Sequence, residues 1–518
     1  LMTYNPEKVI HHIDQRSSLS RNLILLGNKG FNLSLLATDK KPVPPGFIIT
    51  TEIFRCWSVV KNYQMAREEF MSQVREALSA VEEKTGRFFG NQDDPLLVSV
   101  RSGASISMPG MMATIHNVGL NVEIVKGIAE ITGKKYLAWD NFRRFQQSWG
   151  MTMGIGREVF QALMNNSKAR HGVSVKREFT PDQMEELALS YQQEIRDLGI
   201  IIPDDPWLQL TKAIEMVLTS WDAQKTKGYR DLMGVSDSWG TAVIVQCMVF
   251  GNLDRQSGSG VVFTAHPYRK VRRVAWWGDY AAGDQGEDIV GGLVTTYPIS
   301  IEQAEIDGRP VKDSLEKRSP EIYKELLEIA RDLVYEKHWN PQEIEFTFEG
   351  PKASDLYILQ TRDMITIKKK ERFNVFADNG ALHKETIGTG IGVSGSALSG
   401  IAVFNGDNIT KMRQEFPGVP LILIRQDTVP EDITEISKAD GLLTARGGQT
   451  SHAAVVTLRL EKTCVVGCRD LQVYETEERC VLGEHTVHYG DAISIDGRLG
   501  LFLKGRHKVK EEVHILPM

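Results

Sequence analysis

Short apolar runs of strand length recur along the first 360 residues of the chain. They lie at residues 96–100, 241–250, 260–264, 344–348 and 356–360. These runs predict β-strands, and between them the apolar residues follow helical spacing. The alternation of the two patterns indicates an α/β or α+β body.

Two of the expected helices carry clear start signals. Thr180-Pro181-Asp182-Gln183 is a capping box with proline at the first helical position. Ser319-Pro320 opens the second helix, and Asn340-Pro341 is predicted to stop it. The apolar face of this second helix is formed by Ile322, Leu326, Ile329 and Leu333.

The periodic pattern breaks at residues 364–390. Charged residues there are followed by Asn379-Gly380, Gly388 and Gly390. Glycine and asparagine at this density interrupt regular elements. The segment therefore predicts a linker between two domains.

Length, charge and cysteine usage narrow the class of protein. The 518 residues, 42% of them hydrophobic, suffice for roughly two to four domains. No apolar run approaches the roughly 18 residues that span a bilayer, and the N-terminus lacks a signal-peptide pattern, so we expect a cytoplasmic protein without membrane contact. The net charge of −6 gives no reason to expect a nucleic acid partner. Five scattered cysteines argue against a disulfide framework, and we expect Cys464 and Cys468 to be buried thiols rather than metal ligands.

One histidine stands where a glycine pair ends a strand-like run and a helix-compatible run begins. The sequence there is Gly447-Gly448-Gln449-Thr450-Ser451-His452-Ala453-Ala454. Only neutral imidazole can accept a phosphoryl group, and a helix N-terminus disfavours imidazolium and stabilises phosphate. His452 is therefore a candidate phosphoryl carrier. The spacing alone equally allows a capping segment, with Thr450 or Ser451 at the N-cap and an incidental histidine.

Two segments near the N-terminus could bind an anion. In Leu26-Gly27-Asn28-Lys29-Gly30, the glycines allow the backbone to approach an anion, and Lys29 can supply a positive charge to phosphate oxygens. Such short strings also occur in ordinary loops without a ligand. The motif Val43-Pro44-Pro45-Gly46-Phe47 follows it. In Val98-Ser99-Val100-Arg101-Ser102, Arg101 at a strand end could fork onto phosphate or form an ordinary ion pair.

Two carboxylates alternate with apolar residues in Glu343-Ile344-Glu345-Phe346. On a strand, Glu343 and Glu345 project to one face, where they could hold Mg²⁺ that bridges nucleotide phosphates. An exposed strand face with solvated glutamates is the alternative. Gln360 and Arg362 are also two residues apart and could join the same surface.

These motifs together resemble the pyruvate phosphate dikinase and phosphoenolpyruvate synthase family. Gly-Gly-x-Thr-Ser-His-Ala-Ala is similar to the family's phosphohistidine signature, and residues 20–363 resemble its ATP-grasp nucleotide-binding domain. Segments 421–433 and 490–497 follow the family pattern too, and the loop from Ser107 to Met112 favours the dikinase branch. The resemblance implies an α/β (α+β) fold, with an ATP-grasp domain followed by a swivelling β/β/α phosphohistidine domain. The boundaries it implies are 1–363 for the first domain, 364–390 for the linker, 391–508 for the second domain and 509–518 for a C-terminal tail.

The same resemblance assigns expected roles. Lys29, Arg101 and Arg362 would contact ATP phosphates, Gln360 would contact the nucleotide, and Glu343 and Glu345 would hold Mg²⁺. Residues 240–252, with Gln246 and Met248, resemble the strand and hinge that hold the adenine, and Ser257-Gly258-Ser259-Gly260-Val261 resembles a glycine loop over the phosphates. The resemblance also implies that Arg144, Gly110 and Glu287 contribute to binding or transferring phosphate.

The chain also departs from the family pattern. Glu343 replaces the usual aspartate, Ala265 replaces an arginine, and Leu458 and Glu461 replace an arginine and a glycine that normally follow the histidine. We expect the family's third domain, a barrel that binds pyruvate or phosphoenolpyruvate, to be absent from this chain. We expect either a fragment or a protein that passes its phosphoryl group to another polypeptide.

In the expected reaction, ATP pyrophosphorylates His452 and AMP leaves. Inorganic phosphate then removes the terminal phosphoryl group as pyrophosphate, and the remaining phosphohistidine serves pyruvate at a missing or separate barrel. A homodimer is kept as an open expectation. Two alternatives remain: a phosphotransferase with another small-molecule acceptor, as in rifampin phosphotransferase or phenylphosphate synthase, and a regulatory nucleotide-binding protein with decayed catalytic loops.

Overall fold

The structure is a computed structural model, and it describes most of the chain. The described residues are 9–106, 108, 110–265, 276–286, 289, 294, 296–364, 372–377, 385–429, 432–448 and 451–513. The chain forms two compact units. The first comprises Leu1–Val249 and Tyr357–Gln360, and the second comprises Phe250–Leu356 and Thr361–Met518. The division therefore falls inside the segment 1–363, for which the sequence predicts one domain.

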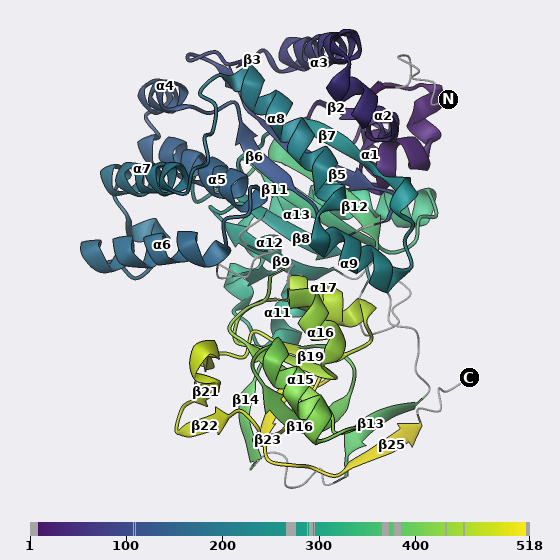
Figure 1. Cartoon of the computed structure of the whole chain (residues 1–518), viewed down its shortest axis with the longest axis vertical. Coiled ribbons are helices and arrows are strands. Elements are labelled where there is room, and N and C mark those ends of the chain that lie inside the picture. The colour runs from purple at the N-terminus through teal and green to yellow at the C-terminus, as the bar shows by residue number, and fades with distance from the viewer. Residues whose placement is uncertain are drawn as a thin grey trace. The chain divides into compact units, whose positions relative to one another are not determined.

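An antiparallel five-stranded sheet forms the centre of the first unit (Figure 1). Its two inner strands β7 and β5 pair over seven consecutive residues, and most of their side chains are buried. The spatial order is β1 (Ile10–His12), β2 (Gly46–Ile49), β7 (Thr241–Cys247), β5 (Val98–Ala104) and β6 (Thr114–Val118). Two further short strands, β3 (Phe88–Phe89) and β4 (Pro95–Leu96), pair with each other.

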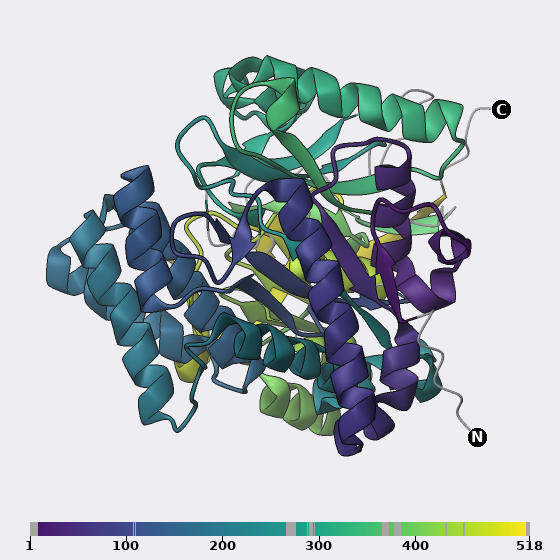
Figure 2. The ribbon, with the colours of Figure 1, turned by 90° about the horizontal axis from the view of Figure 1, so that it is seen from above.

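Helices make up most of the rest of the first unit. The predicted capping box is confirmed: Thr180 accepts a hydrogen bond from the Gln183 amide, and Gln183 bonds back to the Thr180 amide. Four of the helices, α4 to α7, gather at the left of Figure 1, and Figure 2 shows the same blue group from above. The helices are α1 (Leu23–Thr38), α2 (Thr51–Asn62), α3 (Gln64–Thr85), α4 (Val122–Thr132), α5 (Lys135–Thr152), α6 (Arg157–His171), α7 (Pro181–Asp197), α8 (Pro206–Thr219) and α9 (Gln224–Met233).

A second five-stranded sheet carries the predicted metal carboxylates. In spatial order it contains β10 (Tyr297–Pro298), β9 (Trp277–Ala282), β8 (Gly258–Phe263), β11 (Gln342–Phe348) and β12 (Leu356–Asp363). The helices of this region are α11 (Ile301–Asp307), α12 (Leu315–Arg318) and α13 (Pro320–Arg331). The four apolar residues predicted for the face of the segment that begins at Pro320 are all buried. The α-helix ends earlier than predicted, at Arg331, and a π-helical turn, Asp332–Glu336, follows it. His338 then adopts a positive φ of 56°.

An eight-stranded mixed sheet forms the C-terminal region. Its strands β16 to β19 are parallel neighbours, and antiparallel strands flank them. The spatial order is β14 (Thr386–Thr389), β24 (Leu501–Lys504), β23 (Ala492–Asp496), β16 (Ala397–Val403), β17 (Leu421–Arg425), β18 (Gly441–Thr444), β19 (Thr463–Val466) and β15 (Ile391–Ser394). The helices here are α15 (Gly406–Glu415), α16 (Ile433–Lys438) and α17 (His452–Arg459).

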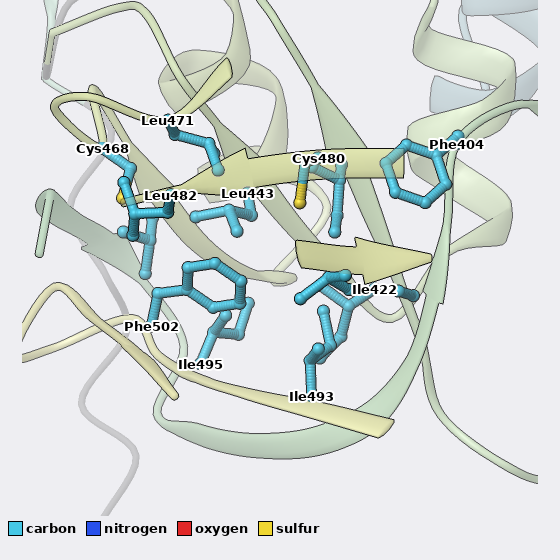
Figure 3. Close-up of a cluster of buried hydrophobic side chains, with 14 residues drawn as sticks. Phe404, Ile422, Leu443, Cys468, Leu471, Cys480, Leu482, Ile493, Ile495 and Phe502 are labelled. Atoms are coloured by element: carbon cyan, nitrogen blue, oxygen red, sulfur yellow. The ribbon is translucent and has the colours of Figure 1, made fainter. Parts of the chain in front are cut away.

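A small sheet closes the apolar core on this region. It consists of β20 (Gln472–Tyr474), β21 (Arg479–Leu482) and β22 (His485–His488). Figure 3 shows Cys468 and Cys480 among the buried aliphatic and aromatic side chains of this core. Burial raises the pKa of both thiols to about 12, so they remain protonated at neutral pH.

Parts of the predicted linker and tail form regular structure. Strand β13 (Arg372–Phe376) pairs along its whole length with β25 (Val509–Val513), and β14 joins the eight-stranded sheet. The helical and sheet content confirms the predicted α/β class. Among the residues described above, no helix is long and apolar enough to cross a membrane.

Candidate functional site

Arg101 lies on β5, and its guanidinium group reaches two other strands. Nη1 donates to the backbone oxygen of Leu359 at 3.1 Å and to Gln246 Oε1 at 3.5 Å, and Nη2 donates to Gln360 Oε1 at 3.4 Å. Arg101, Gln246 and Gln360 are all buried. The structure thus brings together three of the residues predicted for the nucleotide site.

Lys29 lies just after a break in α1. Gly27 has φ 66° and ψ 165°, which are not helical, so a new helical segment begins next to Lys29. A Cβ atom on Gly27 would lie 1.7 Å from the Gly103 oxygen on β5, and one on Gly30 would lie 2.9 Å from Ile48. The glycines therefore allow α1 to approach the sheet, whereas the sequence predicted that they admit an anion.

The predicted alternation on β11 is confirmed. Ile344 and Phe346 are fully buried, and Glu343 and Glu345 share the other face, with Glu343 buried and Glu345 half-buried. Arg362 Nη2, from the neighbouring strand β12, forms an ion pair with Glu343 Oε1. The two carboxylates and this arginine therefore lie on one surface.

This surface fits a magnesium ion by its donor chemistry. Mg²⁺ prefers hard oxygen ligands and is commonly bound by one or two carboxylates together with water and substrate phosphates. Glu343 and Glu345 are such ligands, and the Arg362 charge beside them could contact a bound phosphate. The extra methylene of Glu343, compared with aspartate, is accommodated in a buried position.

The predicted glycine loop is not a loop at Gly258 and Gly260. Both residues lie in β8, between β9 and β11. A Cβ atom on Gly258 would lie 2.6 Å from the Phe348 ring, and one on Gly260 would lie 2.5 Å from the Phe346 ring. Packing beneath two aromatic rings explains these glycines, and any role toward phosphate stays a prediction.

The end of β7 leads into the predicted adenine hinge. The Met248 amide donates to the Leu97 oxygen at 2.8 Å, and its side chain is buried. This bond ties the hinge to the segment before β5. Contact of Met248 with a base stays a prediction.

Arg144 belongs to a buried ion cluster on α5. The two carboxylate oxygens of Asp140 accept hydrogen bonds from Arg143 Nε at 2.9 Å and from Arg144 Nε at 3.1 Å. Lys176 Nζ lies 3.2 Å from Asp140 Oδ2. Burial alone would raise the pKa of Asp140, but Lys176, Arg144 and Arg143 hold it well below its usual range. Asp140 therefore orients Arg144, a contact that sequence spacing i, i+4 allowed but did not single out.

Two predicted phosphate-handling positions receive less support. Gly110 is an exposed turn residue with a positive φ of 72°. Glu287 lies outside the described residues. A role of Gly110 or Glu287 toward phosphate stays a prediction.

His452 is the first residue of α17 and stands four positions after Gly448, the second residue of the glycine pair. Ser451 is the N-cap residue, and its side chain accepts from the Ala454 amide at 3.4 Å. Gly447 adopts a positive φ of 108° in the preceding turn, and His452 is buried. The predicted helix start is confirmed, with Ser451 as the cap.

A charged cluster that the sequence did not single out lies near the carboxyl ends of β17 and β18. Arg425 forms ion pairs with Glu435 and Glu475, and its Nη2 lies 3.4 Å from Asp432 Oδ1. Burial raises the pKa of Asp432 to about 6, although the Arg425 charge opposes the increase. Arg425 and Thr444 are direct partners on parallel strands, so the loops that follow them, including the one before His452, leave the same edge of the sheet.

Comparison with known proteins agrees with this arrangement. Residues 23–326 match the model of the pyruvate phosphate dikinase AMP/ATP-binding domain, and residues 418–500 match the mobile domain of PEP-utilising enzymes. The chain belongs to the pyruvate phosphate dikinase family. His452 falls within the mobile-domain match, and Lys29 and Arg101 fall within the nucleotide-domain match.

Dikinases from distant organisms are among the relatives of this chain. The pyruvate, phosphate dikinase of Rhizobium meliloti is 38% identical over 511 residues, which cover 93% of this chain and 56% of the relative. That of Clostridium symbiosum is 36% identical over 97% of this chain and 59% of the relative, and the chloroplastic enzyme of Mesembryanthemum crystallinum is 34% identical over 93% and 52%. The chain thus spans somewhat more than half the length of these dikinases.

Proposed function

We propose that this chain carries out the ATP-dependent half of a dikinase reaction and stores the phosphoryl group on His452. The main support is the position of His452, which begins a capped helix inside the match to the mobile domain. The match to an AMP/ATP-binding domain supplies the second component. Arg101 with its glutamine partners, and Glu343 with Glu345 and Arg362, are the groups we assign to ATP.

The transfer to histidine breaks one bond of ATP and forms another. A neutral ring nitrogen of His452 attacks the β phosphorus, and AMP leaves with the bridging oxygen. Inorganic phosphate then attacks the γ phosphorus, pyrophosphate leaves, and one phosphoryl group stays on the histidine. In the full reaction we assign this group to pyruvate, which would become phosphoenolpyruvate.

The chain's own side chains offset charge during this transfer. Lys29, Arg101 and Arg362 would bind phosphate oxygens, and Glu343 and Glu345 would hold Mg²⁺, which supplies further charge neutralisation when bound. A helix N-terminus favours the neutral imidazole before transfer and the phosphate after it. A carrier that serves two sites must move between them, so we also propose that residues 391–508 swivel.

One observation favours the regulatory alternative. Ala265, which stands where the family has arginine, packs with Phe263, Trp277 and Met364 in an apolar cluster. This position therefore supplies no charge to a nucleotide. A regulatory protein of this kind would bind ATP without forming phosphohistidine.

Labelling of single variants tests the proposal. The full chain is incubated with Mg²⁺ and ATP that carries label at the β phosphate, and acid-labile label on the protein is counted. We expect the wild type to be labelled, His452→Ala to carry no label while still binding ATP, and a control variant, His507→Ala, to be labelled like the wild type. Equal labelling of wild type and His452→Ala would contradict the assignment.

A further inference from the structure

The proline-rich segment between α1 and β2 contacts two strands that also bind Arg101. Its carbonyl oxygens are the acceptors: Pro44 O accepts from Gln246 Nε2 at 3.0 Å, and Pro45 O accepts from the Cys247 amide at 2.9 Å. Pro42 O accepts from the Ile358 amide on β12 at 2.7 Å. The segment therefore offers acceptors to both strands, while its prolines have no backbone N–H to donate.

Close approach of the segment to β7 depends on Gly46. A Cβ atom on Gly46 would lie 2.5 Å from the Val245 oxygen and 2.9 Å from the Gln246 Cα. Gly46 is also the direct partner of Gln246 in the β2–β7 pairing. The glycine therefore lets the Pro44 carbonyl reach the Gln246 side chain.

The Gln246 amide is engaged at both ends. Its Nε2 donates to Pro44 O, and its Oε1 accepts from Arg101 Nη1. A carbonyl oxygen can only accept and a guanidinium can only donate, so these two partners fix which end of the amide points to which. Gln246 is 1% exposed, so it has little room to turn.

Arg101 is oriented by neutral oxygens from two directions. Gln246 lies on β7, while Leu359 O and Gln360 Oε1 lie on β12, beside the Ile358 that Pro42 binds. These three acceptors orient the guanidinium group.

We propose that Gln246 is a positioning residue that orients Arg101 toward the polyphosphate, and that Pro44 fixes Gln246 in turn. This inference rests on the proposed function, because it gives Arg101 a role toward ATP. It changes the role expected for Gln246: its amide is used to hold the arginine rather than to bind the base. It also gives the segment Val43–Phe47 a purpose that its sequence did not reveal.

A double-mutant cycle tests the link between the two side chains. Gln246→Met, Arg101→Lys and the double variant are prepared in the full chain. The rate at which His452 gains β label in a single turnover and the dissociation constant of ATP are measured for each. Misplacement of a charge by about 1 Å can slow a reaction by about 100-fold, so we expect Gln246→Met to slow labelling about 10- to 100-fold and to weaken ATP binding.

The decisive result is the effect of Gln246→Met when Arg101 is already lysine. Residues that act through one another are not additive, so we expect little further loss in that background. An equal loss in both backgrounds, or no loss in the wild-type background, would overturn the inference. Coupling in the ATP dissociation constants would support it even if the wild type formed no labelled histidine, an outcome that would reject only the proposed function.

Gln209 provides a matched structural control. It is also 1% exposed, but its partners are all backbone groups: its Nε2 donates to Leu120 O and Pro203 O, and its Oε1 accepts from the Gly119 amide. We expect Gln209→Met to lower thermal stability but to leave the labelling rate of the folded protein unchanged. If Gln209→Met slowed labelling as much as Gln246→Met, the effect would be general destabilisation and the inference would be wrong.

Discussion

At the residue scale, Asp432 links the stability of the C-terminal region to pH. Its pKa of about 6 in the folded protein lies above the ordinary value of 3.8. Between these two values the folded state binds more protons than the unfolded state, so the free energy of unfolding contributed by Asp432 falls as the pH rises from about 4 to about 6. Well above pH 6, Asp432 is ionised in both states, and the free energy of unfolding stays lower by the full amount.

We therefore expect Asp432→Asn to remove this part of the pH dependence. Relative to the variant, the wild type should lose up to about 3 kcal/mol of stability as the pH rises through this range, since a tenfold change in proton affinity corresponds to about 1.4 kcal/mol. Urea unfolding, followed by hydrogen exchange of peptides from residues 421–438, measures the difference. A difference that does not change between pH 4 and pH 7 would contradict the pKa assignment.

Glu461 is a second informative residue, because its backbone has φ 52° where the family pattern has glycine. The left-handed region costs a non-glycine residue about 1 kcal/mol or more, whereas glycine adopts it readily. We expect Glu461→Gly to raise the free energy of unfolding by up to about 1 kcal/mol, less the contribution of the side-chain interaction that Glu461 makes. Urea unfolding with the same hydrogen-exchange readout, on peptides covering α17, measures it.

Glu478 is the matched control for this prediction. It has the same φ of 52°, but its Oε1 accepts from Asn405 Nδ2 at 3.3 Å and from Asn408 Nδ2 at 2.8 Å. Glu478→Gly relieves the backbone and loses these bonds, so it should give no gain. Equal stabilisation by both substitutions would show that the carboxylate bonds of Glu478 contribute nothing.

At the element scale, the break in α1 decides how Lys29 is presented. Gly27 and Gly86 have nearly the same φ, 66° and 69°, but a Cβ on Gly86 would meet no heavy atom within 4 Å. Gly86→Ala should therefore lower the free energy of unfolding only by the backbone strain, about 1 kcal/mol. Alanine at Gly27 would meet the Gly103 oxygen and would also have to adopt a ψ of 165°, where Gly86 has 9°, a conformation that only glycine adopts readily, so it should cost more than about 3 kcal/mol.

Thermal unfolding and ATP titration compare these two variants. We expect Gly27→Ala to lower the melting temperature and to weaken ATP binding, because α1 moves away from β5 together with Lys29. Gly86→Ala should bind ATP like the wild type. Similar behaviour of the two variants would mean that α1 does not need its close contact with β5.

The elements predicted best from the sequence are those whose signals are local. The alternation on β11 and the capping box of α7 depend on neighbours within four residues, and both are confirmed. The family resemblance implies a loop at the glycines of β8, which instead lie in a strand. The reason for these glycines is non-local, because the rings of Phe346 and Phe348 come from a strand more than 80 residues away. The same limit applies to the ion cluster of Arg425, whose partner Glu475 is 50 residues away.

At the scale of the whole molecule, the two ends of the C-terminal region are paired. Strands β13 and β25 place the chain entering this region beside the chain leaving it. If this region swivels as proposed, both connections move together as one ribbon. Strand β13 of the predicted linker and strand β25 of the predicted tail therefore form one structural element.

A cross-link across the ribbon tests this pairing. Asn374 and Glu511 are direct partners and are exposed, so Asn374→Cys with Glu511→Cys places two thiols face to face. The five native cysteines are all buried, which favours oxidation of the new pair. We expect the cross-linked protein to label His452 as fast as the reduced protein, and a block that reduction relieves would show that the strands separate during the cycle.

The central claim is that His452 receives both terminal phosphoryl groups of ATP and keeps one. The most direct measurement incubates the full chain with Mg²⁺ and ATP labelled separately at the β and γ phosphates, with and without inorganic phosphate, and follows AMP release and intact protein mass. We predict AMP release with both labels on His452, followed by loss of the γ label alone when phosphate is added. ATP binding without AMP release or any acid-labile adduct would contradict the claim and favour a regulatory protein.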